Sequence, residues 1–206
     1  MRRKAGDSVS LFNGQDGEWS AEISLAGKAR VELRITEMLQ LQEKEPDIWL
    51  IFAPIKMGRI DFLVEKATEL GAAKLLPVFT SRTIVSRVNI DRLKAHAIEA
   101  AEQSERLSVP EITEPMKLEK LLAGWDKNRK IILCDESGTA KKFSNAVSEH
   151  DKSAILIGPE GGFTPEEFKM LYNCPFVIPT SLGPRILRAD TAALAALALW
   201  QELRVL

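Results

Sequence analysis

A glycine-rich segment, Gly158-Pro159-Glu160-Gly161-Gly162, separates an apolar run from a well-marked helix start. The run Ala154–Ile157 predicts a buried strand, and Thr164-Pro165 with Glu167 predicts a capped helix. Open α/β sheets bind ligands at loops that leave the carboxyl ends of their strands. Since glycine lets the backbone approach a ligand closely, the segment predicts a binding loop, with a tight turn that holds no ligand as the alternative.

The charge of this segment favours one class of ligand. It lacks the Lys-Ser/Thr pair of a phosphate-binding P-loop and the glycine spacing of a dinucleotide site. Glu160, Glu166 and Glu167 surround the expected helix N-terminus, where they would repel a phosphate. We therefore expect a neutral or cationic ligand held by backbone groups, and a phosphate-binding α/β enzyme is the disfavoured hypothesis.

A second loop of the same kind spans Ser181 to Ala192 and reads Ser-Leu-Gly-Pro-Arg-Ile-Leu-Arg-Ala-Asp-Thr-Ala. It lies between an expected strand, Phe176–Ile178, and an Ala/Leu-rich helix expected over Ala189–Leu203. The simplest interpretation is a loop with two arginines and an Asp that caps the last helix. Two such loops at successive strand ends nevertheless favour one shared site.

These loops need an α/β domain to position them. Continuous apolar runs predict strands at Ile48–Ala53, Leu75–Phe79, Ile131–Cys134, Ala154–Ile157 and Phe176–Ile178. Helical periodicity predicts helices at Ile60–Leu70, closed by Gly71, at Asp91–Arg106 and at Ala189–Leu203. Because strands that are apolar throughout need cover on both faces, we expect a mostly parallel sheet.

The first forty residues follow a different rhythm. Apolar and polar residues alternate around Val9, over Trp19–Leu25 and over Val31–Ile35, and glycine-containing turns separate these runs. The polar stretch Gln40–Pro46 is typical of a linker. We therefore expect a small β module over residues 1–40 and an α/β domain over residues 46–206.

The composition excludes several classes of protein. The 206 residues are 45% hydrophobic and carry a formal net charge of −1, which is ordinary for a folded domain. The longest apolar run, Ala192–Trp200, is far shorter than the roughly 20 residues that span a bilayer. No signal peptide is apparent, so we expect a cytoplasmic protein without membrane contact. Two Cys and two His argue against a metal site and a triad hydrolase, and Cys134 is expected to be a buried free thiol.

The two loops together resemble a known family. Ile157–Gly162 followed by Leu182–Ala192 is similar to the RsmE family of the SPOUT superfamily, which methylates N3 of a uridine in small-subunit (16S) ribosomal RNA. Further stretches agree with that family: Gly58–Phe62 running into Glu65–Gly71, Ser81-Arg82, and Glu99–Ser104. The resemblance covers nearly the whole chain.

The resemblance implies S-adenosylmethionine as the cofactor, small-subunit ribosomal RNA or the 30S particle as the substrate, and a homodimer. It also implies a PUA-like, β-barrel RNA-binding module and a C-terminal trefoil knot, which sequence physics alone would not propose. Its motifs place one wall of the cofactor pocket at Ile157, Gly158, Pro159, Glu160, Gly161 and Gly162, and the other at Leu182, Gly183, Arg185, Ile186 and Leu187. A sulfonium ligand is cationic at sulfur, in agreement with the acidic loop.

Three departures from the family pattern bear on function. The family usually reads Leu-Arg-Thr-Glu-Thr-Ala where Leu187–Ala192 reads Leu-Arg-Ala-Asp-Thr-Ala, so a hydroxyl is missing and the acid is one methylene shorter. Glu105 stands where the family usually has Gly. The family's first barrel strands correspond to positions upstream of Met1, so we expect a truncated β module. These departures favour, as the alternative function, a non-catalytic knotted factor that binds RNA or assists ribosome assembly.

Methylation of uridine N3 requires loss of its proton and alignment of the methyl group with the nitrogen lone pair. Arg188 is the candidate for stabilising charge on a uracil oxygen, with an interface ion pair as the alternative. Asp190 is the candidate for accepting the proton or orienting Arg188, with a helix cap as the alternative. The expected phosphate contacts are Arg2, Arg3, Lys4, Lys56, Arg59, Arg82 and Arg87, although each alone is equally a solvated surface charge.

The final helix gives an independent reason to expect a dimer. Apolar side chains occur all round Ala192–Trp200. A helix that is apolar on all sides is normally buried on all sides, whereas one sheet covers only one of them. We therefore expect a second copy of the chain to cover the rest.

Overall fold

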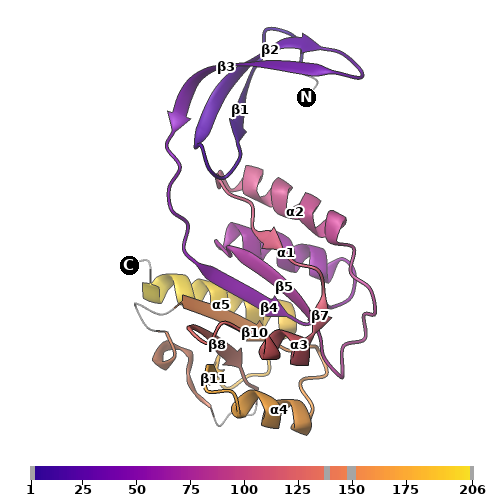
Figure 1. Ribbon diagram of the computed structural model, residues 1–206, viewed down its shortest axis with the longest axis vertical. Coiled ribbons are helices and arrows are strands. Elements are labelled where there is room, and N and C mark those ends of the chain that lie inside the picture. The colour runs from indigo at the N-terminus through magenta and orange to yellow at the C-terminus, as the bar shows by residue number, and fades with distance from the viewer. Residues whose placement is uncertain (1–2, 137–139, 148–151, 205–206) are drawn as a thin grey trace. The chain divides into compact units, whose positions relative to one another are not determined.

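The computed structural model describes residues 3–136, 140–147 and 152–204, and its contacts divide the chain into two units (Figure 1). One unit combines residues 1–45 with residues 101–109, and the other combines residues 46–100 with residues 110–206. The sequence pattern did not indicate that residues 101–109 belong with the small module.

The first unit contains an antiparallel sheet in the order β1-β2-β3. Its strands are β1 (Ser8–Phe12), β2 (Glu18–Ala26) and β3 (Val31–Gln40), which confirms all three expected strands and lengthens the third. The alternating pattern buries Ala21 and Ile23 on one side of β2. Among the described residues, β1 and β3 are both edge strands, so this sheet is open and does not close into a barrel.

The second unit is built on a parallel sheet. Its strands are β4 (Ile48–Phe52), β5 (Lys74–Phe79), β6 (Glu111–Ile112), β7 (Met116–Lys117), β8 (Arg129–Cys134), β9 (Lys141–Lys142), β10 (Lys152–Ile157) and β11 (Val177–Ser181). They run in the order β6-β5-β4-β10-β8-β11-β9, with β7 beside β5. Every strand pairing is parallel, which confirms the expected sheet type.

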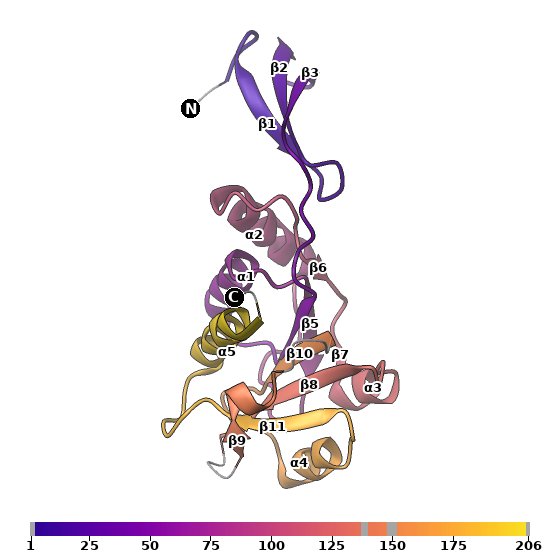
Figure 2. The same cartoon turned by 90° about the vertical axis from the view of Figure 1, so that its left-hand side faces the viewer.

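Helices cover both faces of this sheet (Figure 2). The helices α1 (Arg59–Glu69), α2 (Ile90–Gln103) and α5 (Ala189–Arg204) pack on one face, and α3 (Leu118–Ala123) and α4 (Pro165–Tyr172) on the other. A single turn of 3₁₀ helix spans Phe143–Asn145. Neighbouring strand residues therefore enter different cores, with Leu50 on the α1 side and Ile51 on the α3 side. This two-sided burial explains the continuous apolar runs.

The end of α2 shows a backbone conformation that normally belongs to glycine. The helix was expected to continue to Arg106 but ends at Gln103. Glu105 has φ 57°, and it is the one non-glycine residue with positive φ in the described part of the chain. Its N–H donates to the Glu102 carbonyl, and the Arg106 N–H donates to the Ala101 carbonyl, which is the Schellman pattern.

The strand order decides which loops meet. Because β8 lies between β10 and β11, the loops that leave β10 and β11 flank the end of β8. All three loops leave the same edge of the sheet, since the strands are parallel. Strand order alone does not establish a trefoil knot, which stays a prediction.

Candidate functional site

A cavity of about 280 Å³ lies at the carboxyl ends of β8, β10 and β11. Its walls are the glycine loop (Gly158–Thr164), the arginine loop (Leu182–Arg188), the end of β8 at Cys134–Glu136, and Phe168 of α4. Small-molecule sites in proteins begin at about 300 Å³, so the cavity has the size of a compact ligand site. The two loops singled out in the sequence therefore face one shared space.

The structure places most of the predicted cofactor residues on this cavity. Its lining includes Ile157, Gly158, Pro159, Glu160, Gly162, Leu182, Gly183, Arg185, Ile186 and Leu187, together with Arg188. Gly161 does not line it. The Gly161 carbonyl instead accepts a hydrogen bond from Nη1 of Arg82 at 2.8 Å, and a side chain at position 161 would face Arg82. Asp190 also lies outside the lining.

The glycine loop is held at its carboxyl end by polar contacts of Thr164 and Glu167. Thr164 and Glu167 form the predicted capping box, in which Glu167 Oε2 accepts the Thr164 N–H at 2.8 Å and Thr164 Oγ1 accepts the Glu167 N–H at 3.2 Å. The other oxygen of Glu167 accepts the Ser81 N–H at 2.7 Å. Glu167 is only 3% exposed, so these bonds satisfy a buried carboxylate and fix the loop.

Gly162 is required by the backbone of the same loop. Its φ is 67°, in the left-handed region that residues with a Cβ avoid. A Cβ there would also collide with the Glu136 carboxylate across the cavity wall. The Gly162 N–H donates to the Pro159 carbonyl at 2.9 Å, which closes the turn. The loop is thus built before any ligand arrives.

The arginine loop has far fewer internal contacts. The Gly183 N–H donates to Ser181 Oγ at 3.2 Å, and Ile186 is 80% exposed. Arg185 and Arg188 are exposed. Neither guanidinium has a hydrogen bond or ion pair with any residue that the structure describes. Both arginines therefore line the cavity with free donors.

Arg59, at the start of α1, joins segments from both walls. Its Nε and Nη2 donate to the two carboxylate oxygens of Asp190 at 3.0 and 2.7 Å, and its Nη1 lies 3.5 Å from Glu160 Oε1. Arg59 and Arg82 were expected to contact RNA phosphates, and that prediction stays untested. In the structure, each of these two guanidinium groups contacts a wall of the cavity.

The hydrogen bonds of Asp190 keep its carboxyl group ionised, which suits a residue that anchors the arginine loop. Partial burial raises the pKa of this carboxyl, but hydrogen bonds from the Arg59 guanidinium and the Thr191 N–H outweigh burial and hold the pKa below its usual value. A carboxylate of lowered pKa is a weak base. Asp190 is also the second residue of α5, so it accepts the N–H of the next residue and does not form the N-cap expected from the sequence.

The end of β8 contributes a wall that the sequence analysis missed. Cys134, Asp135 and Glu136 line the cavity, and Tyr172 Oη donates to Asp135 Oδ2 at 2.7 Å. Both cysteines are free, as expected, but Cys134 is half-buried because it faces the cavity. Burial raises the pKa of its thiol to about 12, which excludes a thiolate nucleophile at neutral pH. The sequence signal that could have predicted this wall is the pair of acidic residues directly after the expected strand Ile131–Cys134.

The remaining predicted RNA contacts lie on the surface. Lys56 and Arg87 are exposed in the α/β unit, and Arg3 and Lys4 are exposed in the small unit. Arg2 lies outside the described residues. Within the described ranges, no group of three or more His, Cys, Asp or Glu side chains is placed to hold a metal ion. Across those same ranges, none of the helices combines the length and apolarity needed to cross a membrane.

Comparison with known proteins identifies the family. Residues 42–201 match an RNA methyltransferase domain, and residues 1–36 match an RNA methyltransferase PUA domain. The chain belongs to the RsmE family of RNA methyltransferases. It is 36% identical over 203 residues to ribosomal RNA small subunit methyltransferase E of Rickettsia conorii, an alignment that covers 96% of this chain and 82% of that protein.

Solved structures agree with this membership of the RsmE family. A methyltransferase from Legionella pneumophila, in complex with the cofactor SAM, has a TM-score of 0.87 and 32% identity, covering 98% of this chain and 85% of that one. The ribosomal RNA small subunit methyltransferase E from Neisseria gonorrhoeae, bound to S-adenosyl methionine, has a TM-score of 0.87 and 28% identity over the same shares. The expected fold class, a PUA-like β module with a SPOUT α/β domain, is thereby confirmed.

Proposed function

We propose that this RsmE-family protein transfers the methyl group of S-adenosylmethionine to N3 of a uridine in small-subunit ribosomal RNA. The observation that carries the proposal is the cavity itself, where a glycine loop with acidic neighbours faces two unpaired arginines. The support for uridine N3 in particular is the resemblance of both loops to the RsmE motifs.

The residues of the cavity fit this cofactor. Ile157, Leu182 and Leu187 offer apolar surface for an adenine ring, and the glycine loop lets backbone groups approach closely. The carboxylate of Glu136 suits hydroxyl donors and a cationic sulfonium. When bound, the cofactor supplies an electrophilic methyl group. The glycine loop itself offers a phosphate the acidic side chain of Glu160 and no P-loop lysine.

Arg188 is assigned to the chemistry of the acceptor base. As uridine N3 loses its proton, negative charge develops on the adjacent uracil oxygens. Arg188 lines the cavity with donors that are free to meet such an oxygen. Asp190 is assigned to anchoring, because its carboxylate already accepts two bonds from Arg59 and has a lowered pKa.

The substrate surface and the assembly complete the proposal. Arg3, Lys4, Lys56 and Arg87 are exposed and are proposed to contact RNA phosphates. Leu199 and Leu203 of α5 are 42% and 41% exposed, which supports the proposal that a second copy covers this helix in a homodimer. A ribosomal substrate places the activity in the cytoplasm.

Two measurements test this function. In calorimetric titrations, we expect S-adenosylmethionine to bind at least about tenfold more tightly than ATP, and tighter ATP binding would overturn the cofactor assignment. In a methyl-transfer assay on small ribosomal subunits and on deproteinised 16S RNA, nucleoside mass spectrometry should find N3-methyluridine. A methyl group at another atom would overturn the assignment to N3. Cofactor binding without any transfer would favour the non-catalytic factor.

A further inference from the structure

Arg59 makes polar contacts with a residue in one wall of the cavity and with a residue close to the other wall. In the described part of the chain, Arg59 is the only side chain with polar contacts to both Glu160 of the glycine loop and Asp190, two residues after the arginine loop. Arg59 itself does not line the cavity. Its charge therefore acts on the walls and not directly on a ligand inside.

We propose that Arg59 is a positioning residue that sets Arg188 relative to the cofactor wall. The proposal rests on the function proposed for Arg188. Asp190 follows Arg188 by two residues at the rigid start of α5, so the Arg59–Asp190 pair fixes the end of an otherwise loosely held loop. Two parallel N–H to oxygen bonds define orientation as well as distance, which a single ion pair does not.

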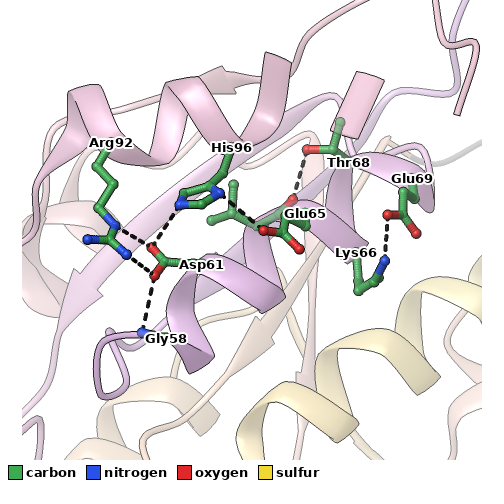
Figure 3. A network of polar contacts seen from close by, with 9 residues as sticks. Gly58, Asp61, Glu65, Lys66, Thr68, Glu69, Arg92 and His96 are labelled. Carbon is green, nitrogen blue, oxygen red and sulfur yellow. Dashed lines mark hydrogen bonds and ion pairs between the residues drawn. The ribbon is translucent and has the colours of Figure 1, made fainter. Parts of the chain in front are cut away.

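The start of helix α1, the helix that carries Arg59, is held by a network of contacts to Asp61 (Figure 3). The Gly58 N–H donates to Asp61 Oδ2 at 3.2 Å, which ties the residue before Arg59 to a carboxylate that is only 7% exposed. Arg92 of α2 donates to both oxygens of Asp61 at 3.1 and 2.8 Å, and His96 Nε2 lies 3.6 Å from Oδ1. Helix α2 thus fixes the point from which Arg59 reaches the cavity walls.

The position of the glycine loop should depend on Arg59 much less than the position of Arg188 does. Arg82 and Glu167 hold that loop independently, whereas Glu160 contributes one contact at 3.5 Å. Removing Arg59 should therefore misplace Arg188 while leaving most of the cofactor wall intact. A displacement of about 1 Å at a catalytic group is enough to lower a rate by about a hundredfold.

The test compares Arg59→Met, Arg59→Lys, Asp190→Asn and the double variant Arg59→Met/Asp190→Asn. For Arg59→Met we expect kcat to fall by about 10- to 100-fold and the affinity for S-adenosylmethionine by about threefold. Arg59→Lys should recover only part of kcat, because an ammonium keeps the charge without the two-pronged geometry. The double variant should lose no more than Arg59→Met alone, since the two residues act as one unit.

A matched control removes another partly buried ion pair of the same unit. Lys74→Met breaks the pair between Lys74 Nζ and Glu111 Oε1, 2.9 Å apart, at the amino end of β5 and thus at the opposite edge of the sheet. It should lower the melting temperature about as much as Arg59→Met and leave kcat unchanged. Full kcat in Arg59→Met, or additive losses in the double variant, would overturn the positioning role.

Failure of the proposed function has a different signature. If the wild-type protein transfers no methyl group to any form of the RNA, the proposed function fails, but the same double-variant comparison is then made with calorimetric S-adenosylmethionine affinities. Non-additive losses of affinity would still support Arg59 and Asp190 as one unit that shapes the cavity. Additive losses would overturn the inference itself.

Discussion

The two loops that wall the cavity are held by the fold in opposite ways. The glycine loop is fixed by a capping box, by a buried Glu167 that also binds the Ser81 N–H, and by Arg82 at its carbonyls. The arginine loop is joined to Ser181, at the end of β11, by two hydrogen bonds of Gly183, and Ile186 is almost fully exposed. One wall is fixed by contacts along the glycine loop, while the other is anchored chiefly at its end, through Asp190 and Arg59.

This difference assigns different tasks to the two walls. A preformed wall binds a small ligand without a cost for ordering the backbone, which suits a cofactor. A loop with unpaired arginines can settle onto a large acceptor that arrives afterwards, which suits RNA. If this division is correct, changes in the glycine loop should lower cofactor affinity, and a change at Arg188 of the arginine loop should lower turnover.

The largest effect is expected from Arg188→Ala. The methyl-transfer rate should fall by about a hundredfold or more, the usual scale for one electrostatic donor, while cofactor affinity stays within about twofold of wild type. Single-turnover assays and calorimetry measure the two quantities, and Arg188→Lys should restore the rate only in part. Full activity in a well-folded Arg188→Ala variant would disprove the catalytic assignment and move the search to Arg3, Lys4 and the other basic residues.

Neighbouring glycines provide the next test. Gly162→Ala should weaken S-adenosylmethionine binding by about tenfold, because a left-handed φ costs about 1–2 kcal/mol with a Cβ and Glu136 must move. Gly161→Ala is the matched control. A Cβ there would meet Arg82 at 3.4 Å, an ordinary contact, so calorimetry should find nearly unchanged affinity. Equal losses at both positions would contradict the geometry described for this loop.

Removing the buried carboxylate should loosen the preformed wall. Glu167→Gln keeps one acceptor but loses a charge-assisted bond to a backbone N–H, so the free energy of unfolding should fall by about 1.5 kcal/mol. Urea denaturation measures this loss. The exposed neighbour supplies the control, since Glu166→Gln should change stability much less than Glu167→Gln does. If the two variants are equally stable, Glu167 does not brace the loop.

The smallest effect concerns pH and the anchor of the arginine loop. The pKa of Asp190 is lower in the folded than in the unfolded protein. The pair with Arg59 therefore stabilises the folded protein fully at pH values above the unfolded-state pKa of about 3.9. This stabilisation is lost as the pH falls through the lower pKa of the folded state. Wild type should exceed Asp190→Asn in unfolding free energy by less than about 1 kcal/mol at pH 7, since the pair is partly exposed. This difference in unfolding free energy should be smaller at pH 3 than at pH 7. A difference that grows on acidification would contradict the Arg59–Asp190 ion pair.

Features set by short-range chemistry were predictable from the sequence. The parallel strands follow from continuous apolar runs, and the start of α4 follows from Thr164, Pro165 and Glu167, because a capping box is completed within four residues. The end of α2 was not predictable in this way. A Schellman turn is usually marked by glycine, and Glu105 stands at its left-handed position, so the helix was expected to continue to Arg106.

The arrangement of side chains across the cavity was decided only by the tertiary structure. Arg59 and Asp190 are 131 positions apart, and nothing local to either residue indicates the other. The third wall at Cys134–Glu136 exists because β8 is inserted between β10 and β11. Likewise, Gly161 faces Arg82 and not the cavity because the segment after β5 crosses the glycine loop. Sequence periodicity records which face of an element is buried, whereas strand order decides which distant loops become neighbours.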